Sequence, residues 1–382
     1  MGRETLAVTS DFFFYGTMAH RPLMQIALGR PVQAEAAFMS DHALYSAEGG
    51  LYPLMVREAG AKAAGLLVRG LNDIEKERLD LYEGAFGYQA QEMQVVLPDG
   101  RAVPAMIYYP GPENWGDGPG APWHLAEWQA QYGAEFEATL RDLMAMFGVK
   151  PPRQLAARFH QMLTRGASRV RAAAVAPTTL RHNAGAGDVL VEALREPYAR
   201  FFAVEEMDLS FRRFDGAMSP MVTRASFVAS DAVTVLPYDP VRDRVLVVDQ
   251  FRAGPFMRGD AQAWQIEAIA GRIDPGETPE AAARREAVEE AGLHLQELLP
   301  VARYYPSPGC MSEFLYSYVA VTDLPDNAAG VFGVEGEAED IRGHLIGFDR
   351  LMDLVSTGEV GNAPLVLTAF WLANNRSRLR GV

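Results

Sequence analysis

The chain has 382 residues, of which 49% are hydrophobic and 22% charged, values typical of a soluble globular protein long enough for two ordinary domains. Its formal net charge is -14 and no basic stripe offsets the acidity, so we expect no nucleic-acid partner. Its one cysteine, Cys310, excludes an internal disulfide and favours a reducing, cytoplasmic setting, and no apolar run is long enough to imply a membrane partner.

The first part of the chain predicts a small domain of strands. Residues 11–18 read as a buried strand that ends in a Gly turn, and residues 61–71 as a second strand. Residues 72–82 predict a short helix. Two apolar runs within 92–110, joined by a Pro-Asp-Gly turn, predict a β-hairpin.

Helices are expected next. Apolar residues recur every three or four positions through 123–147, which predicts a long amphipathic helix, and two prolines end it. A second helix is expected at 153–164. We therefore place the domain boundary near 165, giving domains of residues 1–165 and 166–382.

The second part of the chain mixes strands and helices. Residues 190–255 are rich in predicted strands, and a final helix is expected near 363–375. The order predicts an α/β layered domain whose mixed sheet is covered by helices. Three aromatic side chains, Phe202, Phe256 and Trp264, could stack on a base, but aromatic residues within apolar runs more often belong to the core.

A cluster of acidic residues lies near the end of a short predicted helix. Thr278 suits its N-cap and Gly292 its C-terminal stop. Glu286, Glu289 and Glu290 fall within an arc of roughly 100° on that helix, where like charges repel and the helix dipole disfavours anions. A solvated acidic face leaves both penalties unexplained, whereas a divalent cation removes them.

Residues 271–293, GRIDPGETPEAAARREAVEEAGL, follow the Nudix hydrolase box position by position, with Ala287 as a small residue in an apolar slot. The resemblance extends over about 190–380 and is closest to the ADP-ribose pyrophosphatase branch, in which a proline such as Pro308 of the SPG element follows the box. It implies a C-terminal α/β/α sandwich with a mixed sheet.

The resemblance also implies a metal site. Glu286 and Glu290, with the carbonyl of Ala270, would bind Mg²⁺, for which Mn²⁺ is a possible substitute, and Glu289 would assist both at the metal site and in catalysis. Arg285 orients a box glutamate in this family. Clustered carboxylates with bound cations supply the charge neutralisation that pyrophosphate hydrolysis needs.

Other residues would contact the substrate. The resemblance assigns Arg252, Ser307, Pro308 and Glu313 to substrate binding. The general base should be a separate acid, and the acidic segment 335–340 offers Glu337 and Glu339, although the same segment also reads as a solvated loop.

The implied reaction is the Mg²⁺-dependent cleavage of ADP-ribose, a nucleotide-sugar substrate, to AMP and ribose 5-phosphate. Another nucleoside diphosphate sugar stays open as the substrate, because the box determines the bond cleaved and says little about the leaving group. The family also implies a homodimer formed through the strands around 190–225.

The N-terminal domain resembles the γ-glutamylcyclotransferase-like (AIG2-like) fold, a small mixed β-barrel with helices. The motif FYGTM places Tyr15, Gly16 and Thr17 where the family binds a carboxylate through backbone N–H groups, and LDLYEGAFGY places Glu83 at the acid/base position, with Tyr88 also matched. Either γ-glutamyl cyclotransferase activity or a non-catalytic binding module fits these motifs. Together the two domains are similar to a family of tellurite-resistance-associated proteins.

Overall fold

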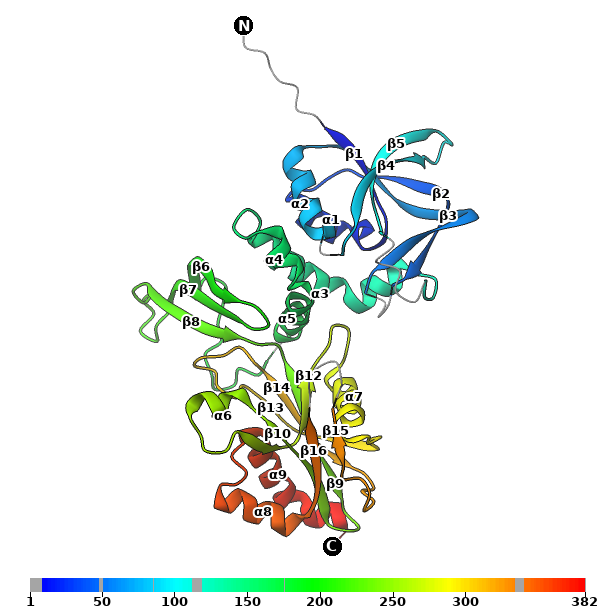
Figure 1. Cartoon of the computed structure of the whole chain (residues 1–382). Helices are drawn as coiled ribbons and strands as arrows, with labels where there is room; N and C mark the ends of the chain where they lie inside the picture. The colour runs from blue at the N-terminus through cyan, green and yellow to red at the C-terminus, as the bar shows by residue number, and fades with distance from the viewer. Residues whose placement is uncertain are drawn as a thin grey trace. The chain divides into compact units, whose positions relative to one another are not determined.

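A computed structural model of the chain (Figure 1) describes residues 9–47, 51–84, 86–111, 119–174, 176–333 and 340–381. Contacts within the chain divide it into two compact units, Met1–Ala176 and Pro177–Val382. The expected boundary near 165 falls inside helix α5 (Phe159–Ala172), whose buried Leu163 packs into the core of the first unit.

The first unit contains five strands and six helical segments among the described residues. In chain order these are β1 (Ser10–Phe14), η1 (Gly16–Ala19), α1 (Arg21–Leu28), β2 (Glu35–Ser46), β3 (Pro53–Leu71), α2 (Asp73–Gly84), β4 (Gln89–Val96), β5 (Ala102–Tyr109), α3 (Leu125–Ala145), α4 (Pro152–Ala156) and α5.

The five strands close into a barrel in the order β1-β3-β2-β4-β5. Strand β1 shows how the barrel is packed, because Phe12, Phe13 and Phe14 are all buried although successive side chains point to opposite faces. Phe13 faces the barrel interior, and Phe12 and Phe14 face the helices. The predicted mixed barrel with helices is confirmed.

The helices cover the outside of the barrel. The predicted helix at 123–147 is α3, which buries Trp128, Phe136, Leu140 and Leu143 at helical spacing. The single helix expected at 153–164 is wrong: two helices, α4 and α5, meet at a break after Ala156, and α5 continues to Ala172.

The second unit contains eleven strands and four helices among its described residues. These are β6 (Val189–Ala199), β7 (Ala203–Phe211), β8 (Val222–Val228), β9 (Ala232–Asp239), β10 (Arg244–Phe251), α6 (Ala253–Arg258), β11 (Trp264–Glu267), β12 (Ile269–Arg272), α7 (Pro279–Ala291), β13 (Glu297–Tyr304), β14 (Leu315–Val321), β15 (Val331–Phe332), β16 (Ile341–Gly347), α8 (Phe348–Thr357) and α9 (Ala363–Arg380).

A mixed sheet forms the centre of this unit, in the order β13-β14-β9-β10-β16-β15, with β11 paired to β10 and β12 to β9. Strands β9 and β14 run parallel, and the other pairs are antiparallel. Along β10, Leu246 and Val248 pack under α7, whereas Val245 and Val247 pack under α8 and α9. The sheet therefore lies between helical layers (Figure 1), which confirms the predicted α/β/α sandwich.

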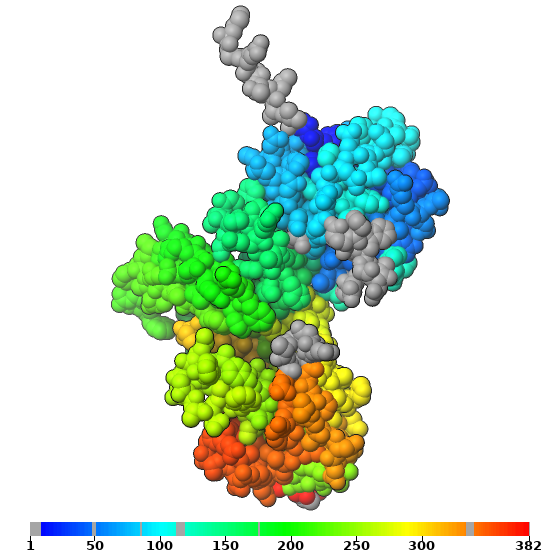
Figure 2. Space-filling model, viewed as in Figure 1, coloured from blue at the N-terminus to red at the C-terminus, as the bar shows by residue number. Residues whose placement is uncertain are grey.

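Strands β6, β7 and β8 form a separate antiparallel sheet. It is linked to the loop between β13 and β14 through the Phe227 N–H, which donates to the Cys310 carbonyl at 2.8 Å. Figure 2 shows these strands, in green, at the molecular surface. Among the described helices of the chain, none combines the length and apolar character needed to cross a bilayer.

Candidate active site

Helix α7 carries three glutamates at its C-terminal end. The Thr278 hydroxyl accepts the Ala281 N–H at 3.1 Å as the N-cap, and Gly292 ends the helix in the left-handed region, with φ 61°. Glu286 and Glu290 are buried, at 9% and 3% exposure, on the face that packs against β12. Buried carboxylates need compensating partners, so their surroundings determine what this helix end can do.

Gly271 on β12 makes room for one of these carboxylates. A Cβ atom at this position would lie 1.9 Å from the Cδ atom of Glu286, which no real contact allows. The glycine is therefore required by space, not by backbone conformation. Next to it, the Ala270 N–H donates to Glu290 Oε2 at 3.1 Å.

Arg285 holds the remaining acidic side chains of the box together. Its Nη1 donates to Glu286 at 2.7 Å and to Glu289 at 2.9 Å, its Nε donates to Glu277 at 3.0 Å, and its Nη2 donates to the Arg272 carbonyl at 2.8 Å. Burial lowers the pKa of Arg285, but the bond to Glu277 and the charge of Glu286 outweigh burial, so the pKa is raised. This guanidinium stays charged and balances the acidic cluster.

A second group of charges surrounds Glu313. Burial raises the pKa of Glu313, the positive charges of Arg272 and Arg252 lower it, and the negative charge of Asp231 raises it again. Arg252 is itself held by the buried carboxylate of Glu267, to which Nη2 donates at 2.6 Å and Nε at 3.1 Å. Two predicted substrate-binding residues, Arg252 and Glu313, therefore lie within electrostatic reach of each other.

The turn between β6 and β7 brings aromatic rings to Arg272. Its guanidinium lies 4.2 Å from the centroid of the Phe201 ring and 5.3 Å from that of Phe202, within cation–π range. Phe202 also contacts Phe227 of β8, with ring centroids 4.7 Å apart.

The expectation that Phe202, Phe256 and Trp264 belong to the core is wrong. They are 37%, 65% and 57% exposed. Phe256 and Trp264 both contact the exposed Phe251 ring instead of entering a core. Trp264 is the first residue of β11, and Phe256 lies on the short helix α6, none of whose residues is buried.

The SPG element forms a compact turn. The Ser307 carbonyl accepts the N–H groups of Cys310 and Met311, both at 3.1 Å, and the turn is tied to β8 through Phe227. Ser307 and Pro308 thus lie on a loop attached to the sheet that carries Phe202. Glu337 and Glu339, the predicted candidates for the base, lie outside the described residues.

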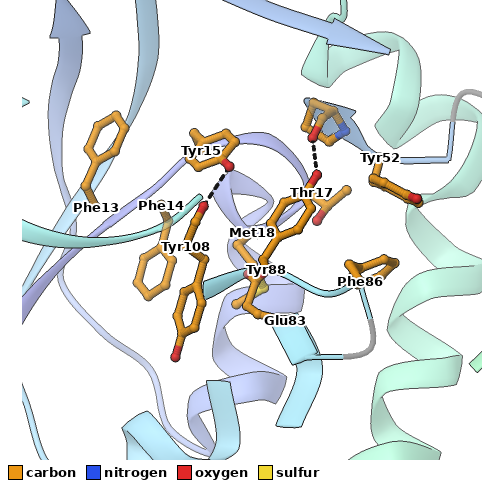
Figure 3. Close-up of a pocket in the computed structure, with 11 residues that line it drawn as sticks. Phe13, Phe14, Tyr15, Thr17, Met18, Tyr52, Glu83, Phe86, Tyr88 and Tyr108 are labelled. Atoms are coloured by element: carbon orange, nitrogen blue, oxygen red, sulfur yellow. Dashed lines mark hydrogen bonds between the residues drawn. The ribbon is translucent and has the colours of Figure 1, made fainter. Parts of the chain in front are cut away.

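A small pocket in the first unit contains the other predicted site (Figure 3). The Tyr15 hydroxyl donates to the Tyr108 carbonyl at 2.7 Å, and the Tyr88 hydroxyl donates to the Pro53 carbonyl at 2.7 Å. The Thr17 hydroxyl lies 3.2 Å from that of Tyr82. Eleven residues line the pocket: Phe13, Phe14, Tyr15, Thr17, Met18, Tyr52, Pro53, Glu83, Phe86, Tyr88 and Tyr108.

Gly16, the remaining member of the predicted carboxylate-binding turn, has φ 61° and packs against Pro53, where a Cβ atom would lie 2.3 Å from the proline ring. Both the backbone conformation and the space at this turn therefore require glycine.

Glu83 is the one carboxylic acid among these lining residues, and no lysine, arginine or histidine accompanies it. Burial raises the pKa of Glu83 to about 8, so the side chain is mostly neutral at pH 7. The cavity has a volume of about 20 Å³, room for roughly one water molecule.

Comparison with known proteins identifies both units. The family model for gamma-glutamyl cyclotransferase, AIG2-like, matches residues 12–130, and the NUDIX domain model matches residues 229–366. The chain is 35% identical to ADP-ribose pyrophosphatase of Escherichia coli strain K12 over 204 residues, 53% of this chain and 97% of that relative. It is 31% identical to the Haemophilus influenzae ADP-ribose pyrophosphatase over 48% of this chain and 85% of that relative.

More distant matches follow. The chain is 28% identical to GDP-mannose pyrophosphatase of Escherichia coli strain K12 / DH10B, over 45% of this chain and 88% of that relative. A crystal structure of an ADP compounds hydrolase matches with a TM-score of 0.39 and 22% identity, over 49% of this chain and 96% of that one.

The chain therefore belongs to the Nudix hydrolases. In particular, it joins an AIG2-like γ-glutamyl cyclotransferase domain to a Nudix domain, and its relatives include pyrophosphatases named for ADP-ribose and for GDP-mannose. Nudix hydrolases generally act with divalent metal ions.

The residues at the end of α7 fit such an ion by their chemistry. Carboxylate and carbonyl oxygens are the donors that hard divalent cations prefer, and the space beside Gly271 admits a carboxylate that a Cβ would displace. Within the described residues no three acidic, histidine or cysteine side chains stand close enough to hold a metal ion. Instead, Glu286 and Glu289 contact Arg285, and Glu290 accepts the Ala270 N–H.

Three charged residues near this site escaped the sequence reasoning: Asp231, Glu267 and Arg272. Glu267 stands three residues before Ala270 in a strand, and Arg272 follows directly after Gly271. Glu267 and Arg272 lie on β11 and β12, whereas Asp231 directly precedes β9, and only the fold shows that they converge with Arg252 and Glu313.

Proposed function

We propose that the Nudix domain hydrolyses the pyrophosphate bond of ADP-ribose with Mg²⁺, yielding AMP and ribose 5-phosphate. The observation that carries this proposal is the burial of Glu286 and Glu290 against β12 at the position made by Gly271. The 35% identity across nearly the whole Escherichia coli ADP-ribose pyrophosphatase supports the choice of substrate.

In the proposed mechanism Glu286, Glu290 and the Ala270 carbonyl would hold Mg²⁺ or Mn²⁺, and the bound ion would supply charge neutralisation for the phosphates and a site for the attacking water. Glu289 assists at the same helix end. Arg285 keeps the carboxylates in place through its bonds to Glu286 and Glu289.

The substrate is proposed to bind beside this cluster. The Arg252 guanidinium would donate hydrogen bonds to a phosphate oxygen. The Glu313 carboxylate would accept a hydrogen bond from a hydroxyl or amine group of the substrate. Phe201 and Phe202, whose rings lie within cation–π range of Arg272, are proposed to stack on the adenine. Either Glu337 or Glu339 is proposed as the general base.

Product analysis tests the main proposal. Chromatography after incubation with ADP-ribose and Mg²⁺ should show AMP and ribose 5-phosphate from the wild type. Glu290→Gln keeps the size of the side chain but removes its charge. Its activity should fall by more than the roughly 10–100-fold that is typical when a residue outside the metal's own ligands is lost. An active Glu290→Gln would contradict the metal role, and an inactive wild type would contradict the substrate.

GDP-mannose, or another nucleoside diphosphate sugar, is the alternative substrate. The GDP-mannose pyrophosphatase relative supports it at 28% identity. Comparing kcat/KM for ADP-ribose, GDP-mannose and ADP-glucose under one Mg²⁺ concentration decides between them, because specificity is a ratio of these values.

A homodimer formed through β6–β8 is proposed as the assembly. This sheet and its turns expose many large apolar side chains, and exposed apolar surface of this kind marks interaction sites. They are Val189, Leu190, Val191, Leu194, Tyr198, Phe201, Phe202, Phe211 and Phe227. Light scattering should give twice the mass of 41.9 kDa, and Val191→Asp should shift it toward one copy.

The pocket of Glu83 supports a second candidate function, γ-glutamyl cyclotransferase activity. In that reaction the substrate α-amine attacks its own γ-carbonyl, the amide bond to the leaving amine breaks, and 5-oxoproline forms. The pKa of Glu83, raised to about 8 by burial, suits an acid that exchanges protons near neutral pH. Release of 5-oxoproline that stops in Glu83→Gln would support it, and its absence from wild type with γ-glutamyl amines would favour a non-catalytic binding module.

A further inference from the structure

A buried carboxylate lies between the proposed substrate-binding arginine and the C-terminal helix. Glu267 on β11 is 6% exposed. Its Oε2 atom accepts two N–H groups of Arg252, and its Oε1 atom accepts the Nδ2–H of Asn362 at 3.0 Å. Each oxygen of Glu267 therefore has a partner from a different segment of the chain.

Asn362 uses both ends of its amide. Its Oδ1 atom accepts the Leu365 N–H at 3.2 Å, which makes it the N-cap of α9. Because the cap requires the oxygen at that end, the Nδ2 group must point at Glu267. The loop before α9 also lies against β11, since a Cβ on Gly361 would meet the Gln265 side chain at 3.8 Å.

Arg252 needs this support. Its backbone lies at the N-cap of the short helix α6, and its side chain is 42% exposed, so a long side chain at this position has many rotamers unless it is anchored. A carboxylate held at both oxygens presents a defined acceptor edge to the guanidinium. The position of the Arg252 guanidinium therefore depends on how firmly Glu267 is held.

We infer that Asn362 is a positioning residue for substrate binding, acting through Glu267 on Arg252. The inference rests on the proposed function, in which Arg252 contacts the substrate diphosphate. Asn362 itself touches neither the substrate nor the box carboxylates. Its amide donor fixes Glu267, Glu267 fixes the Arg252 guanidinium, and the start of α9 thereby contributes to affinity for the nucleotide sugar.

Two substitutions separate this role from simple helix capping. Asn362→Asp keeps an acceptor of the same size for the Leu365 N–H, and aspartate caps helices as well as asparagine. It also turns an oxygen toward Glu267 in place of the donor. Asn362→Ala removes both functions. If Asn362 only caps α9, Asn362→Asp behaves as wild type and Asn362→Ala is the worse variant.

With ADP-ribose and Mg²⁺, we expect Asn362→Asp to raise KM about 10-fold with kcat within about 3-fold of wild type. In an Arg252→Ala background the same substitution should add almost nothing to KM, because the residue through which it acts is gone. A normal KM in Asn362→Asp, or an equal increase in both backgrounds, would overturn the inference.

A substrate-free measurement keeps this test apart from that of the proposed function. The NMR signal of the Arg252 Nε–H, assigned by its loss in Arg252→Lys, should exchange slowly in wild type and be broadened or lost in Asn362→Asp. If wild type did not cleave ADP-ribose, the proposed substrate would fail while this readout still decided the positioning. An Nε–H signal unchanged by Asn362→Asp would overturn the inference without reference to turnover.

Discussion

The two units contain buried glutamates in opposite electrostatic settings. In the Nudix domain Arg285 bonds to Glu277, Glu286 and Glu289. In the AIG2-like domain the pocket of Glu83 offers hydroxyl groups but no cation among its lining residues. The first setting places a positive charge among the carboxylates, and the second surrounds a carboxylic acid with uncharged groups, so burial alone does not tell what a glutamate does.

The largest expected effect comes from Gly271→Ala, which tests the glutamates of the Nudix domain. The new methyl group conflicts with the Glu286 carboxylate at 1.9 Å, so Glu286 must turn out of its place. We expect a loss of activity above about 100-fold and a stability loss of about 1–3 kcal/mol. Kinetics and thermal unfolding measure both.

Gly347→Ala is the matched control, because a Cβ there meets nothing within 4 Å. It should keep wild-type turnover. Full activity in Gly271→Ala would show that the position of Glu286 does not matter for the reaction.

Replacing Arg285 with Lys should have the next largest effect. A lysine offers a point charge and cannot bridge Glu277, Glu286 and Glu289 at once. We expect turnover to fall about 10–100-fold. Because metal binding relieves the repulsion left among the carboxylates, Mg²⁺ should raise Tm more in this variant than in wild type.

The neighbouring Arg284→Lys is the control, since Arg284 donates to the backbone carbonyls of Leu295 and Gln296. Its turnover should stay close to that of wild type. Equal losses in the two variants would assign the effect to general destabilisation.

Glu83→Gln tests the buried carboxylic acid of the AIG2-like domain through the pH dependence of its stability. The folded-state pKa of Glu83 is raised from 4.5 to about 8, so below pH 4.5 both folded and unfolded chains hold the proton. As pH rises from 4.5 toward 8 the unfolded chain loses the proton first, and wild type loses up to about 1.4 kcal/mol of stability per pH unit at this residue. Glu83→Gln removes that loss.

Hydrogen exchange of peptides from β4 and β5 reports this stability within the intact chain. The protection gained by Glu83→Gln over wild type should increase from pH 5 to pH 8. Glu127→Gln, on the exposed face of α3, should give no such trend. A pH-independent difference for Glu83→Gln would mean that its carboxyl is paired in solution.

The smallest expected effect is that of Tyr88→Phe, which removes the hydroxyl that donates to the Pro53 carbonyl. Loss of this partly buried hydrogen bond should cost about 1 kcal/mol. Tyr45→Phe, whose hydroxyl contacts the exposed Glu58, should cost less. Both variants should hydrolyse ADP-ribose like wild type, and a change in turnover would show that the two units communicate.

The sequence was enough to predict those features whose residues lie close together along the chain. The cap at Thr278, the stop at Gly292 and the three glutamates all lie in one helix, so their proximity followed from the helical repeat. Helix α3 was equally clear, because its apolar side chains recur along one face.

Features that depend on distant segments were not visible in the sequence. Strand β2 was not predicted because Asp41, with φ 55°, interrupts its alternation, and its pairing with β3 and β4 makes it a strand. Glu267 meets Asn362 across 95 positions of sequence, and the exposure of Trp264 depends on what the fold leaves uncovered. Tertiary pairing, not local propensity, decided these positions.

The aromatic residues that line the pocket of Glu83 determine where the chain can be truncated. Phe159 of α5 packs on Phe86 with ring centroids 4.8 Å apart, and α5 begins well after residue 130, where the family match ends. Cutting the chain at that point would remove Phe136, Leu140 and Phe159 from the apolar core. The core residues left behind would be exposed and prone to aggregation. The smallest excised piece that stays in solution should therefore run through Ala172, the end of α5.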